Sequence, residues 1–578
     1  MDATAVSPGG AGSHRVFVLG LALALTLANA LKPVAVDDPA YLRQAGWWAA
    51  HPLDPLGGEA LNYQKLVPAS QVASAPVGIA WLALGSRLAG GAEWRLKLWL
   101  FPFAWLLAWG LHDLLRHAAP SLAKIWLVGA ILSPALLPSF GFMLEVPMLA
   151  LAMASLAVFA RGVQKDPWQS ALAAGVLAGL ALQTKYSGAP ILVALVAWGA
   201  CRGRWRAGAL AALTALALFG AIEMALRLGA GASPLVAYAA SRGMRDPDGH
   251  LPWLTGWRLM RMAGTVAPVL IPLGLTALGA PRRWVWAALA AIPLGYACFS
   301  FAPPGVVLFL DRVTAGRLIN FENVTIAWMG PALAAVAALA AWRACRAPNS
   351  FPARALAVWL GAECLMAPFV SASASVRRVL GALLAFSLVL ARLAHDVVRR
   401  DPARRADVVA CVTMSVALGL AFWGVDVDSA LADRRALALV TARLATEHDR
   451  GQVAFVGNHW TSFQYAASRS GWREVALGRS ALRGGDWLVV PFEIGGHGVA
   501  LDPSGLALVD SVPLPHRLPV TTRRSFYDGR TAFRRVDPGW AGARIWRVIA
   551  DGEVLGLAGS LSRADSLRLP PLPPVPSR

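Results

Sequence analysis

The amino-acid sequence predicts an all-α polytopic membrane protein with about thirteen transmembrane helices, followed by a smaller α/β domain. Three observations support this fold class. First, 57% of the 578 residues are hydrophobic and only 15% are charged, whereas soluble domains carry about 25% charged residues. Second, the apolar residues form runs separated by short basic clusters, which is typical of proteins that cross a membrane many times. Third, no apolar run after residue 425 is long enough to span a membrane.

Thirteen apolar windows form the predicted spans. A further apolar stretch, 76–90, has only about fifteen residues, whereas a spanning helix needs about twenty. If 76–90 stays at the surface, the later basic clusters fall on the same side of the membrane as Arg15; if it crosses, they fall on the opposite side. The positive-inside rule therefore predicts that 76–90 is an interfacial helix. The predicted spans are 15–33, 98–115, 123–139, 145–161, 168–185, 187–201, 207–227, 259–279, 284–303, 323–342, 355–372, 378–395 and 406–424.

This orientation places the N-terminus in the cytoplasm, and it places the first long loop and the C-terminal domain outside. In the C-terminal domain, 453–456 and 487–490 are predicted as short buried strands, and 428–448 and 461–470 as helices. The last dozen residues are rich in Pro and Ser, which predicts disorder. The predicted organisation is a cytoplasmic tail (1–14), a transmembrane domain (15–425) that contains the first outer loop (34–97), an outer α/β domain (426–565) and a disordered tail (566–578).

The formal net charge of +20 would suggest nucleic acid if the basic residues formed one continuous face. They lie instead between apolar segments, so the sequence predicts cytoplasmic positive loops and no nucleic-acid partner. The five cysteines lie in or beside apolar segments, without CxxC or Cys/His spacing. This pattern predicts packing roles, and neither a disulfide framework nor a zinc site.

Two adjacent aspartates, Asp37 and Asp38, follow directly on the first apolar segment. Charges so close to hydrocarbon are expensive, which makes the pair a functional-site hypothesis. The alternative is that both cap a short interfacial helix, because Asp is favoured at helix N-termini. Two carboxylates this close raise each other's proton affinity, which suits a general base.

Further charged groups emerge on the same outer side from segments far apart in sequence. They cluster at the outer mouth of the predicted bundle, whereas a transport path favours charges near the mid-plane. The sequence thus predicts an active site at the outer interface. The cations at 65, 87, 95 and 97 lie on this side too and are expected to be ordinary interfacial residues. The candidate residues are Glu145, Lys185, Tyr186, Arg377 and Arg378.

Four signatures in order along the chain give this pattern a family resemblance. The chain resembles the membrane-embedded polyprenyl-phosphate-sugar glycosyltransferases of the GT-C fold. Within these it is similar to the bacterial family 39 type, relatives of the protein O-mannosyltransferases and of the lipid A aminoarabinose transferase. The resemblance covers roughly residues 15–425. The signatures are Asp37-Asp38-Pro39-Ala40-Tyr41-Leu42 with His51-Pro52-Leu53-Asp54-Pro55-Leu56 downstream, Met143-Leu144-Glu145-Val146-Pro147, Thr184-Lys185-Tyr186-Ser187-Gly188 and, more weakly, Arg377-Arg378.

The sequence departs from the family pattern at three places. Glu145 stands where the family usually has Asp, so this carboxylate is one methylene longer. An Asn-Pro-Pro-Leu-like segment of the first loop is reduced to Ser74-Ala75-Pro76-Val77, and the usual Arg-Tyr-Leu-Leu-Pro is reduced to Arg378-Val379-Leu380. The last two departures fall on expected substrate contacts and leave the carboxylates in place.

The resemblance implies an inverting transfer of a sugar from a polyprenyl phosphate to an acceptor hydroxyl of a protein, lipid or glycan. It implies a multi-pass protein of a bacterial inner membrane, in contact with membrane lipids and with its site on the periplasmic side. The chain has no GxGxxG, Walker or HExxH motif. No cofactor is therefore indicated, and a divalent metal has no support. The alternatives are a transporter or flippase for lipid-linked sugars, and a relative that binds a lipid-linked glycan without turnover.

The resemblance also implies roles for the candidate residues. Asp37 would be the general base, Asp38 would orient Asp37 or the acceptor, and Glu145 would position the acceptor or sugar. Lys185 would pair with the phosphate, for which the alternative is a snorkelling helix-end lysine. The expected phosphate contacts also include Arg377 and Arg378 through bidentate bonds, and Tyr186 through stacking or its hydroxyl, with ordinary interfacial anchoring as the alternative for all three.

Overall fold

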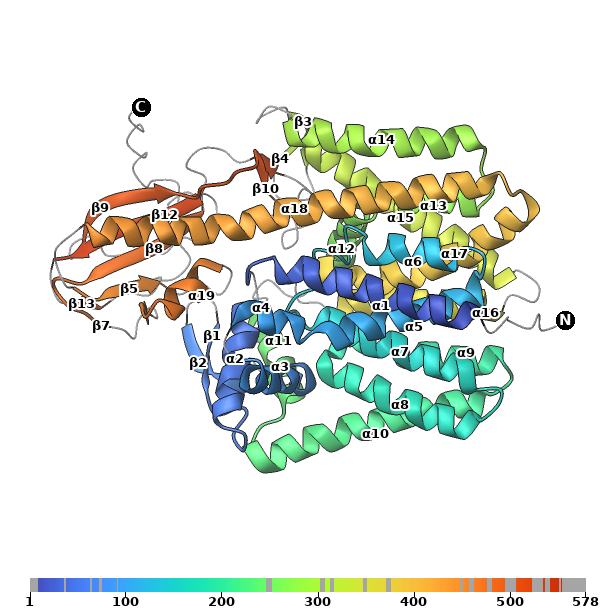
Figure 1. Ribbon diagram of the computed structural model, residues 1–578, viewed down its shortest axis with the longest axis horizontal. Helices are drawn as coiled ribbons and strands as arrows, with labels where there is room; N and C mark the ends of the chain where they lie inside the picture. Colours follow the sequence, from blue (N-terminus) through green and yellow to red (C-terminus); the bar gives the residue numbers. More distant parts are fainter. Residues whose placement is uncertain are drawn as a thin grey trace.

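The computed structural model describes residues 9–35, 38–62, 65–71, 75–90, 92–245, 252–301, 307–311, 317–346, 351–370, 376–446, 451–456, 462–475, 481–493, 506–521, 534–535, 541–549 and 552–553. The protein is mostly helical. Figure 1 shows a bundle whose long helices run side by side. A β-sheet region lies beyond one end of this bundle, and α1 begins at the other end.

The helices form where the apolar runs are longest, and several of them, among them α3, α5, α8 and α9, have proline in the first turn. Proline suits this position because its fixed φ is helical and its missing N–H would have no partner there. The helices are α1 (Gly9–Ala30), α2 (Asp38–Ala50), α3 (Pro76–Leu88), α4 (Glu93–Leu98), α5 (Phe101–Ala118), α6 (Ala123–Ile131), α7 (Glu145–Gly162), α8 (Pro167–Thr184), α9 (Pro190–Cys201), α10 (Trp205–Ala230), α11 (Pro234–Arg245), α12 (Pro252–Val266), α13 (Leu270–Ala277), α14 (Arg282–Phe301), α15 (Phe321–Arg346), α16 (Phe351–Val370), α17 (Leu380–Arg400), α18 (Arg404–Ala445) and α19 (Ser462–Arg469), with 3₁₀ turns η1 (Ala69–Gln71), η2 (Tyr186–Gly188) and η3 (Val376–Val379).

Each of the thirteen predicted windows contains a helix, but the described residues show fewer segments that are long and apolar enough to cross a membrane. Six helical segments meet that standard, and seven do if α12 and α13, bent by 85° at their junction, form one span. The other windows include short helices, such as α6 with 9 residues and α9 with 12. The protein is thus a multi-pass membrane protein with six or seven candidate spans, and thirteen spans stay a prediction.

Helix α3 occupies the stretch predicted to lie at the interface. It has 13 residues, too few to span a bilayer. In Figure 1 it is seen nearly end-on, whereas α1, α5 and α7 run lengthwise. Its Trp81 stacks on Trp99, and each indole N–H donates to the main-chain oxygen of the other residue, at 3.2 and 3.0 Å. These bonds fix α3 across the end of the bundle.

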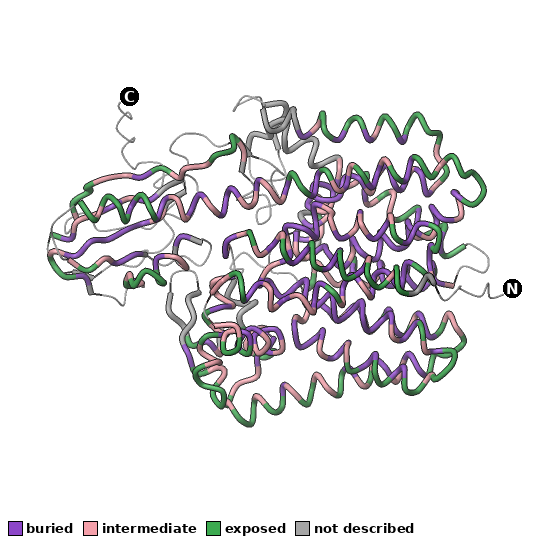
Figure 2. The backbone as a smooth tube through the Cα atoms, viewed as in Figure 1, coloured by how far each residue is buried: buried purple, intermediate pink, exposed green. Residues whose placement is uncertain are grey.

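The core of the bundle is centred on α7, which packs between α5 and α8 and is almost wholly buried (Figure 2). At Gly110 the backbones of α5 and α7 approach so closely that a Cβ would lie 2.7 Å from the Met153 carbonyl carbon. By contrast, α10 at the edge of the bundle exposes large apolar side chains, among them Leu213, Met224 and Leu228. Exposed apolar side chains on an outer helix are expected where lipid takes the place of water.

Helix α18 has 42 residues and crosses residue 425 without a break, so that the predicted span 406–424 and the predicted helix 428–448 form one helix. Its last turns pack on the C-terminal sheet through Ala436, Leu437 and Val440. Figure 1 shows this helix running from the bundle to the sheet. The C-terminal region therefore has a continuous helical connection to the membrane domain.

The C-terminal region contains a mixed five-stranded sheet in the order β6-β5-β8-β12-β9. Strand β5 pairs in parallel with β6 and β8, while β12 pairs antiparallel with β8 and β9. The predicted strands at 453–456 and 487–490 are present as β5 and β8, and α19 falls in the predicted 461–470 helix. The strands are β1 (Glu59–Asn62), β2 (Lys65–Pro68), β3 (Val307–Asp311), β4 (Arg317–Asn320), β5 (Val453–Val456), β6 (Arg473–Val475), β7 (Ala481–Leu482), β8 (Trp487–Glu493), β9 (Leu506–Pro513), β10 (Val520–Thr521), β11 (Arg534–Arg535), β12 (Ala541–Val548) and β13 (Gly552–Glu553).

Candidate active site

Asp38 is the first residue of α2 and lies just beyond the end of α1. It is only 4% exposed. Its Oδ2 accepts a hydrogen bond from the Ala35 N–H at 3.4 Å, and its Oδ1 has no hydrogen-bond partner among the described residues. Asp37 lies outside the described residues. The structure therefore presents one member of the predicted pair as a buried carboxylate with an unoccupied oxygen.

Burial raises the pKa of the Asp38 carboxyl to about 6. The ammonium groups of Lys97 and Lys32 and the Ala35 N–H oppose this shift, and Glu93 adds to it. The main cause is therefore desolvation, whereas the sequence suggested repulsion between adjacent carboxylates. A carboxylate whose pKa lies near neutral pH and which has a free oxygen is suited to accept a proton.

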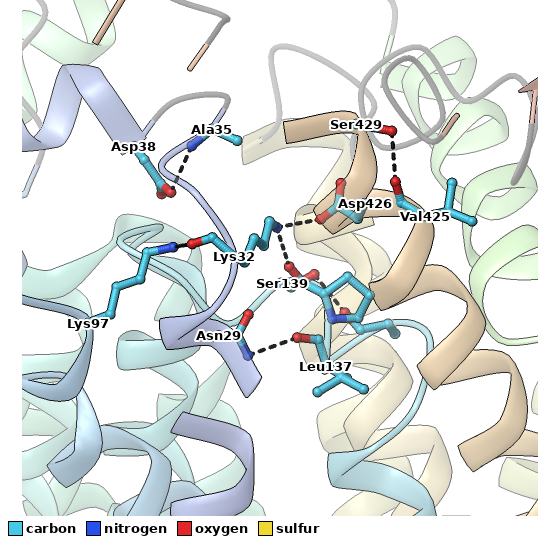
Figure 3. A network of polar contacts seen from close by, with 12 residues as sticks. Asn29, Lys32, Ala35, Asp38, Lys97, Leu137, Ser139, Val425, Asp426 and Ser429 are labelled. Atoms are coloured by element: carbon cyan, nitrogen blue, oxygen red, sulfur yellow. Dashed lines mark hydrogen bonds and ion pairs between the residues drawn. The ribbon is translucent and has the colours of Figure 1, made fainter. Parts of the chain in front are cut away.

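A polar network lies beside Asp38 at the end of α1 (Figure 3). The Lys97 ammonium donates to the main-chain oxygen of Lys32. The Lys32 ammonium in turn forms an ion pair with Asp426 of α18 and donates to the Pro138 oxygen at 2.9 Å. Asn29 donates to the Leu137 oxygen at 3.2 Å. These bonds join the end of α1 to α4, to α18 and to the segment between α6 and α7.

A second charged cluster forms around Glu145, the first residue of α7. Glu145 is 1% exposed, and its Oε1 lies 2.6 Å from the Lys185 Nζ and 3.7 Å from the Arg377 Nε. Arg378 interacts electrostatically with both Glu145 and Lys185. The Glu145 Oε2 has no hydrogen-bond partner among the described residues. Three cations from two separate segments thus surround one carboxylate, and the cluster carries an excess of positive charge.

Local structure explains how these side chains meet. Lys185 ends α8 because its backbone is extended, with φ −161° and ψ 131°, and the 3₁₀ turn η2 follows before Pro190 starts α9. The arginines lie in the 3₁₀ turn η3 directly before α17. Glu145 lies in the first turn of α7, where the helix dipole favours a negative charge. All three segments therefore place their charged residue at a helix end.

The segment between α6 and α7 connects the two clusters. A Cβ built on Gly141 would lie 3.6 Å from both carboxylate oxygens of Asp38. Two residues later, the Met143 sulfur accepts a hydrogen bond from the Arg377 Nη1 at 2.7 Å. Glu145 follows after two more residues. Asp38 and the Glu145 cluster thus flank one short segment at the same end of the bundle.

Tyr186 belongs to a different set of contacts. Its hydroxyl donates to the Glu223 Oε1 of α10 at 3.0 Å, and its ring packs edge-on against Phe219 and Tyr238. Glu223 also accepts from the Ser233 hydroxyl at 2.7 Å and from the Leu235 N–H at 3.2 Å. Through Glu223, the Tyr186 hydroxyl therefore links η2 to α10 and α11. The structure brings Lys185 but not Tyr186 to Glu145.

Sequence reasoning missed the residues that surround Asp38. Lys97 was expected to be an interfacial cation, yet it is 2% exposed. Glu93 accepts from the Val34 N–H and forms an ion pair with Arg434 of α18. Charged residues at the start of an apolar window were the only available signal, because the contacts join residues between 59 and 341 positions apart. Among the described residues, no group of three or more His, Cys, Asp or Glu side chains could hold a metal ion.

No known protein family matches the sequence, and no curated protein is significantly similar to it. Solved structures to which the fold is similar include the following two. The archaeal oligosaccharyltransferase AglB from Archaeoglobus fulgidus, with an inhibitory peptide and a dolichol-phosphate, is 12% identical, with 82% of this chain and 69% of that chain covered and a TM-score of 0.42. ArnT from Cupriavidus metallidurans, bound to undecaprenyl phosphate, is 14% identical, with 93% and 98% covered and a TM-score of 0.36.

Proposed function

We propose that the protein is an inverting membrane glycosyltransferase of the GT-C type. It would transfer a sugar from a polyprenyl-phosphate donor to an acceptor hydroxyl at the periplasmic face of a bacterial inner membrane. The observation that carries this proposal is the gathering of Lys185, Arg377 and Arg378 around Glu145, at the same end of the bundle as Asp38. The resemblance of the four sequence signatures to family 39 glycosyltransferases supports the same reaction class.

The cation cluster supports the donor half of this proposal. A polyprenyl phosphate presents an anionic group close to the membrane surface, with its apolar chain in the hydrocarbon. The cluster has three cations and one carboxylate in a buried setting, where charge–charge attraction is stronger than in water. Arginine pairs with phosphate through two parallel hydrogen bonds, and lysine pairs with it as a point charge. These groups would stabilise the charge that develops on the departing phosphate.

The aspartate pair supports the acceptor half. The acceptor oxygen would attack the anomeric carbon while its proton passes to an aspartate. The bond from that carbon to the phosphate oxygen breaks, and its electron pair leaves with the polyprenyl phosphate. The family resemblance assigns the proton to Asp37, whereas the free Oδ1 and raised pKa of Asp38 support Asp38. Tyr186, held by Glu223, would fix the segment that carries Lys185.

A transfer assay in proteoliposomes tests this function. Purified protein is given radiolabelled hexosyl- and pentosyl-undecaprenyl phosphates together with a bacterial membrane extract as the source of acceptor. We expect label transfer by the wild type and a loss of at least 100-fold when the carboxylate that acts as base is changed to Asn, because general base catalysis contributes about 10²–10⁴-fold. Asp37→Asn and Asp38→Asn are measured separately, which identifies the base.

Asp166→Asn is the matched control, because Asp166 is an exposed aspartate directly before α8, at the opposite end of that helix from Lys185. It should transfer label at the wild-type rate. If both Asp37→Asn and Asp38→Asn also transfer at that rate, the aspartate pair has no catalytic role. If the wild type transfers no label but moves the labelled lipid across the bilayer, the protein is a transporter and not an enzyme. If it binds the labelled lipid without transferring label or moving the lipid, it is a non-catalytic relative.

A further inference from the structure

Lys97 is a lysine whose burial sequence reasoning did not anticipate. It lies on the short helix α4 and is among the largest fully buried side chains of the described residues. A lysine at the end of a membrane helix normally snorkels, with its ammonium in water. At 2% exposure Lys97 does not snorkel. A buried ammonium is expensive unless nearby groups compensate its charge, so its surroundings identify what it interacts with.

The ammonium has three kinds of neighbour. It donates to the Lys32 main-chain oxygen, lies 5.8 Å from the centroid of the Phe142 ring and is 3.7 Å from the Glu93 Oε1. Glu93, however, also interacts with the Arg434 guanidinium and with the Val34 N–H. The negative charge of Glu93 is therefore shared. Asp38 is the other buried carboxylate beside this segment: a Cβ on Gly141 would lie 3.6 Å from both of its carboxylate oxygens, and the next residue, Phe142, faces the Lys97 ammonium.

The remaining charged groups near Asp38 do not replace Lys97. Lys32, at the end of α1, is paired with Asp426 of α18. Arg434 of α18 is paired with Glu93 of α4. Lys32 and Arg434 thus each have a carboxylate partner of their own, whereas Lys97 lies beside the segment next to Asp38. Because it also holds the Lys32 oxygen and faces the Phe142 ring, it contacts both chain segments that enclose the aspartate.

We propose that Lys97 is a positioning residue that holds Asp38 in its ionised, proton-accepting form and fixes the backbone before it. This inference rests on the proposed function, in which the aspartate pair accepts the proton of the acceptor. Lys97 does not touch the substrate in this scheme, and it acts only through Asp38.

Infrared titration of the purified protein tests this role without substrate. The carboxyl band of Asp38 is assigned by its loss in Asp38→Asn. We expect the band to titrate near pH 6 in the wild type and at least about one pH unit higher in Lys97→Met, because loss of a neighbouring opposite charge raises a carboxyl pKa by about 1–3 units. Lys97→Arg keeps the charge and should titrate within about half a unit of the wild type.

Arg95→Met is the matched control, because Arg95 lies on the same helix with an exposed side chain. Its titration should equal that of the wild type. Size-exclusion chromatography in detergent confirms that each variant is folded before titration. The positioning role is overturned if the Asp38 band titrates at the same pH in folded Lys97→Met as in the wild type. It is also overturned if the band titrates at the same pH in folded Lys97→Arg as in Lys97→Met. A failed transfer assay would overturn the proposed function alone, because the titration requires no turnover.

Discussion

Glu145 and Lys185 form the ion pair at the centre of the candidate site, and their burial makes each dependent on the other. The side chains are 1% and 12% exposed. We expect Glu145→Gln to lower the free energy of unfolding by about 3–5 kcal/mol, because it leaves the buried Lys185 ammonium without a counter-charge. Lys185→Met should lower it by less, because Arg377 and Arg378 still face Glu145. The double variant should lose less than the sum of the two, with a coupling of about 1–3 kcal/mol in thermal unfolding.

The pair Arg392–Asp396 is the control for this cycle. It has a similar distance, 2.9 Å, but is more exposed, with 22% and 29% of the side chains accessible. Such i,i+4 pairs contribute about 0.3–0.5 kcal/mol. A coupling between Glu145 and Lys185 no larger than that of the control would show that the site does not depend on this pair.

The pH dependence of transfer should follow the Asp38 carboxyl if it accepts the proton. Its pKa is raised to about 6, so the group is protonated and inactive below that pH and ionised above it. The value of kcat/KM, taken from initial rates at low donor concentration, should therefore rise about tenfold per pH unit up to pH 6 and level off above it. An acidic limb centred near 4, the ordinary value for aspartate, would contradict this assignment.

At the scale of elements, α18 joins the C-terminal region to the site through two ion pairs, Asp426–Lys32 and Arg434–Glu93. We expect Asp426→Asn and Arg434→Met each to lower transfer about tenfold, equivalent to about 1.4 kcal/mol, because each releases a group that supports the backbone before Asp38. The measurement is kcat/KM with melting temperature as the stability reading.

Arg443→Gln is the comparison variant on the same helix. Its ion pair with Asp510 is 3.0 Å long but lies on the surface, with 52% and 37% of the side chains exposed. Surface pairs contribute little, so transfer should be unchanged. Equal effects of all three substitutions would indicate that α18 acts on stability in general and not on the aspartate.

The elements were predictable to the extent that a local pattern encodes them. Apolar windows predicted where helices form, and short apolar runs predicted β5 and β8. The continuity of α18 was not predicted, because the composition becomes polar after residue 425 while Ala436, Leu437 and Val440 still face the sheet core. Lys97 is buried only because α1, α4 and the segment before α7 fold together, which no local pattern records.

At the scale of the whole molecule, the predicted orientation can be tested with cysteines at the two ends of the bundle. Cys345 is exposed beside Arg343 and Arg346, in a cluster predicted to be cytoplasmic. Leu53, in the first loop, is 93% exposed. In intact cells a membrane-impermeant maleimide should label Leu53→Cys in a cysteine-free chain, and it should label Cys345 alone only after the membrane is permeabilised.

The reverse labelling would invert the orientation and place the aspartate in the cytoplasm, where the proposed periplasmic reaction could not occur. Labelling of both positions in intact cells would show a damaged membrane. Ser86 lies near the end of α3, whereas Leu53 precedes that helix. If α3 lies at the interface and does not cross the membrane, Ser86→Cys should be labelled from the same side as Leu53→Cys.

The unbroken α18 sets a fixed angular relation between the sheet and the membrane domain. At 1.5 Å per residue its 42 residues span about 63 Å, roughly twice the hydrocarbon thickness of a bilayer. One residue inserted between Asp426 and Ala436 would turn the sheet by about 100° and advance it by only about 1.5 Å. Such an insertion would therefore change the orientation of the sheet far more than its distance from the membrane domain, and the unbroken helix determines which face of the sheet is turned towards that domain.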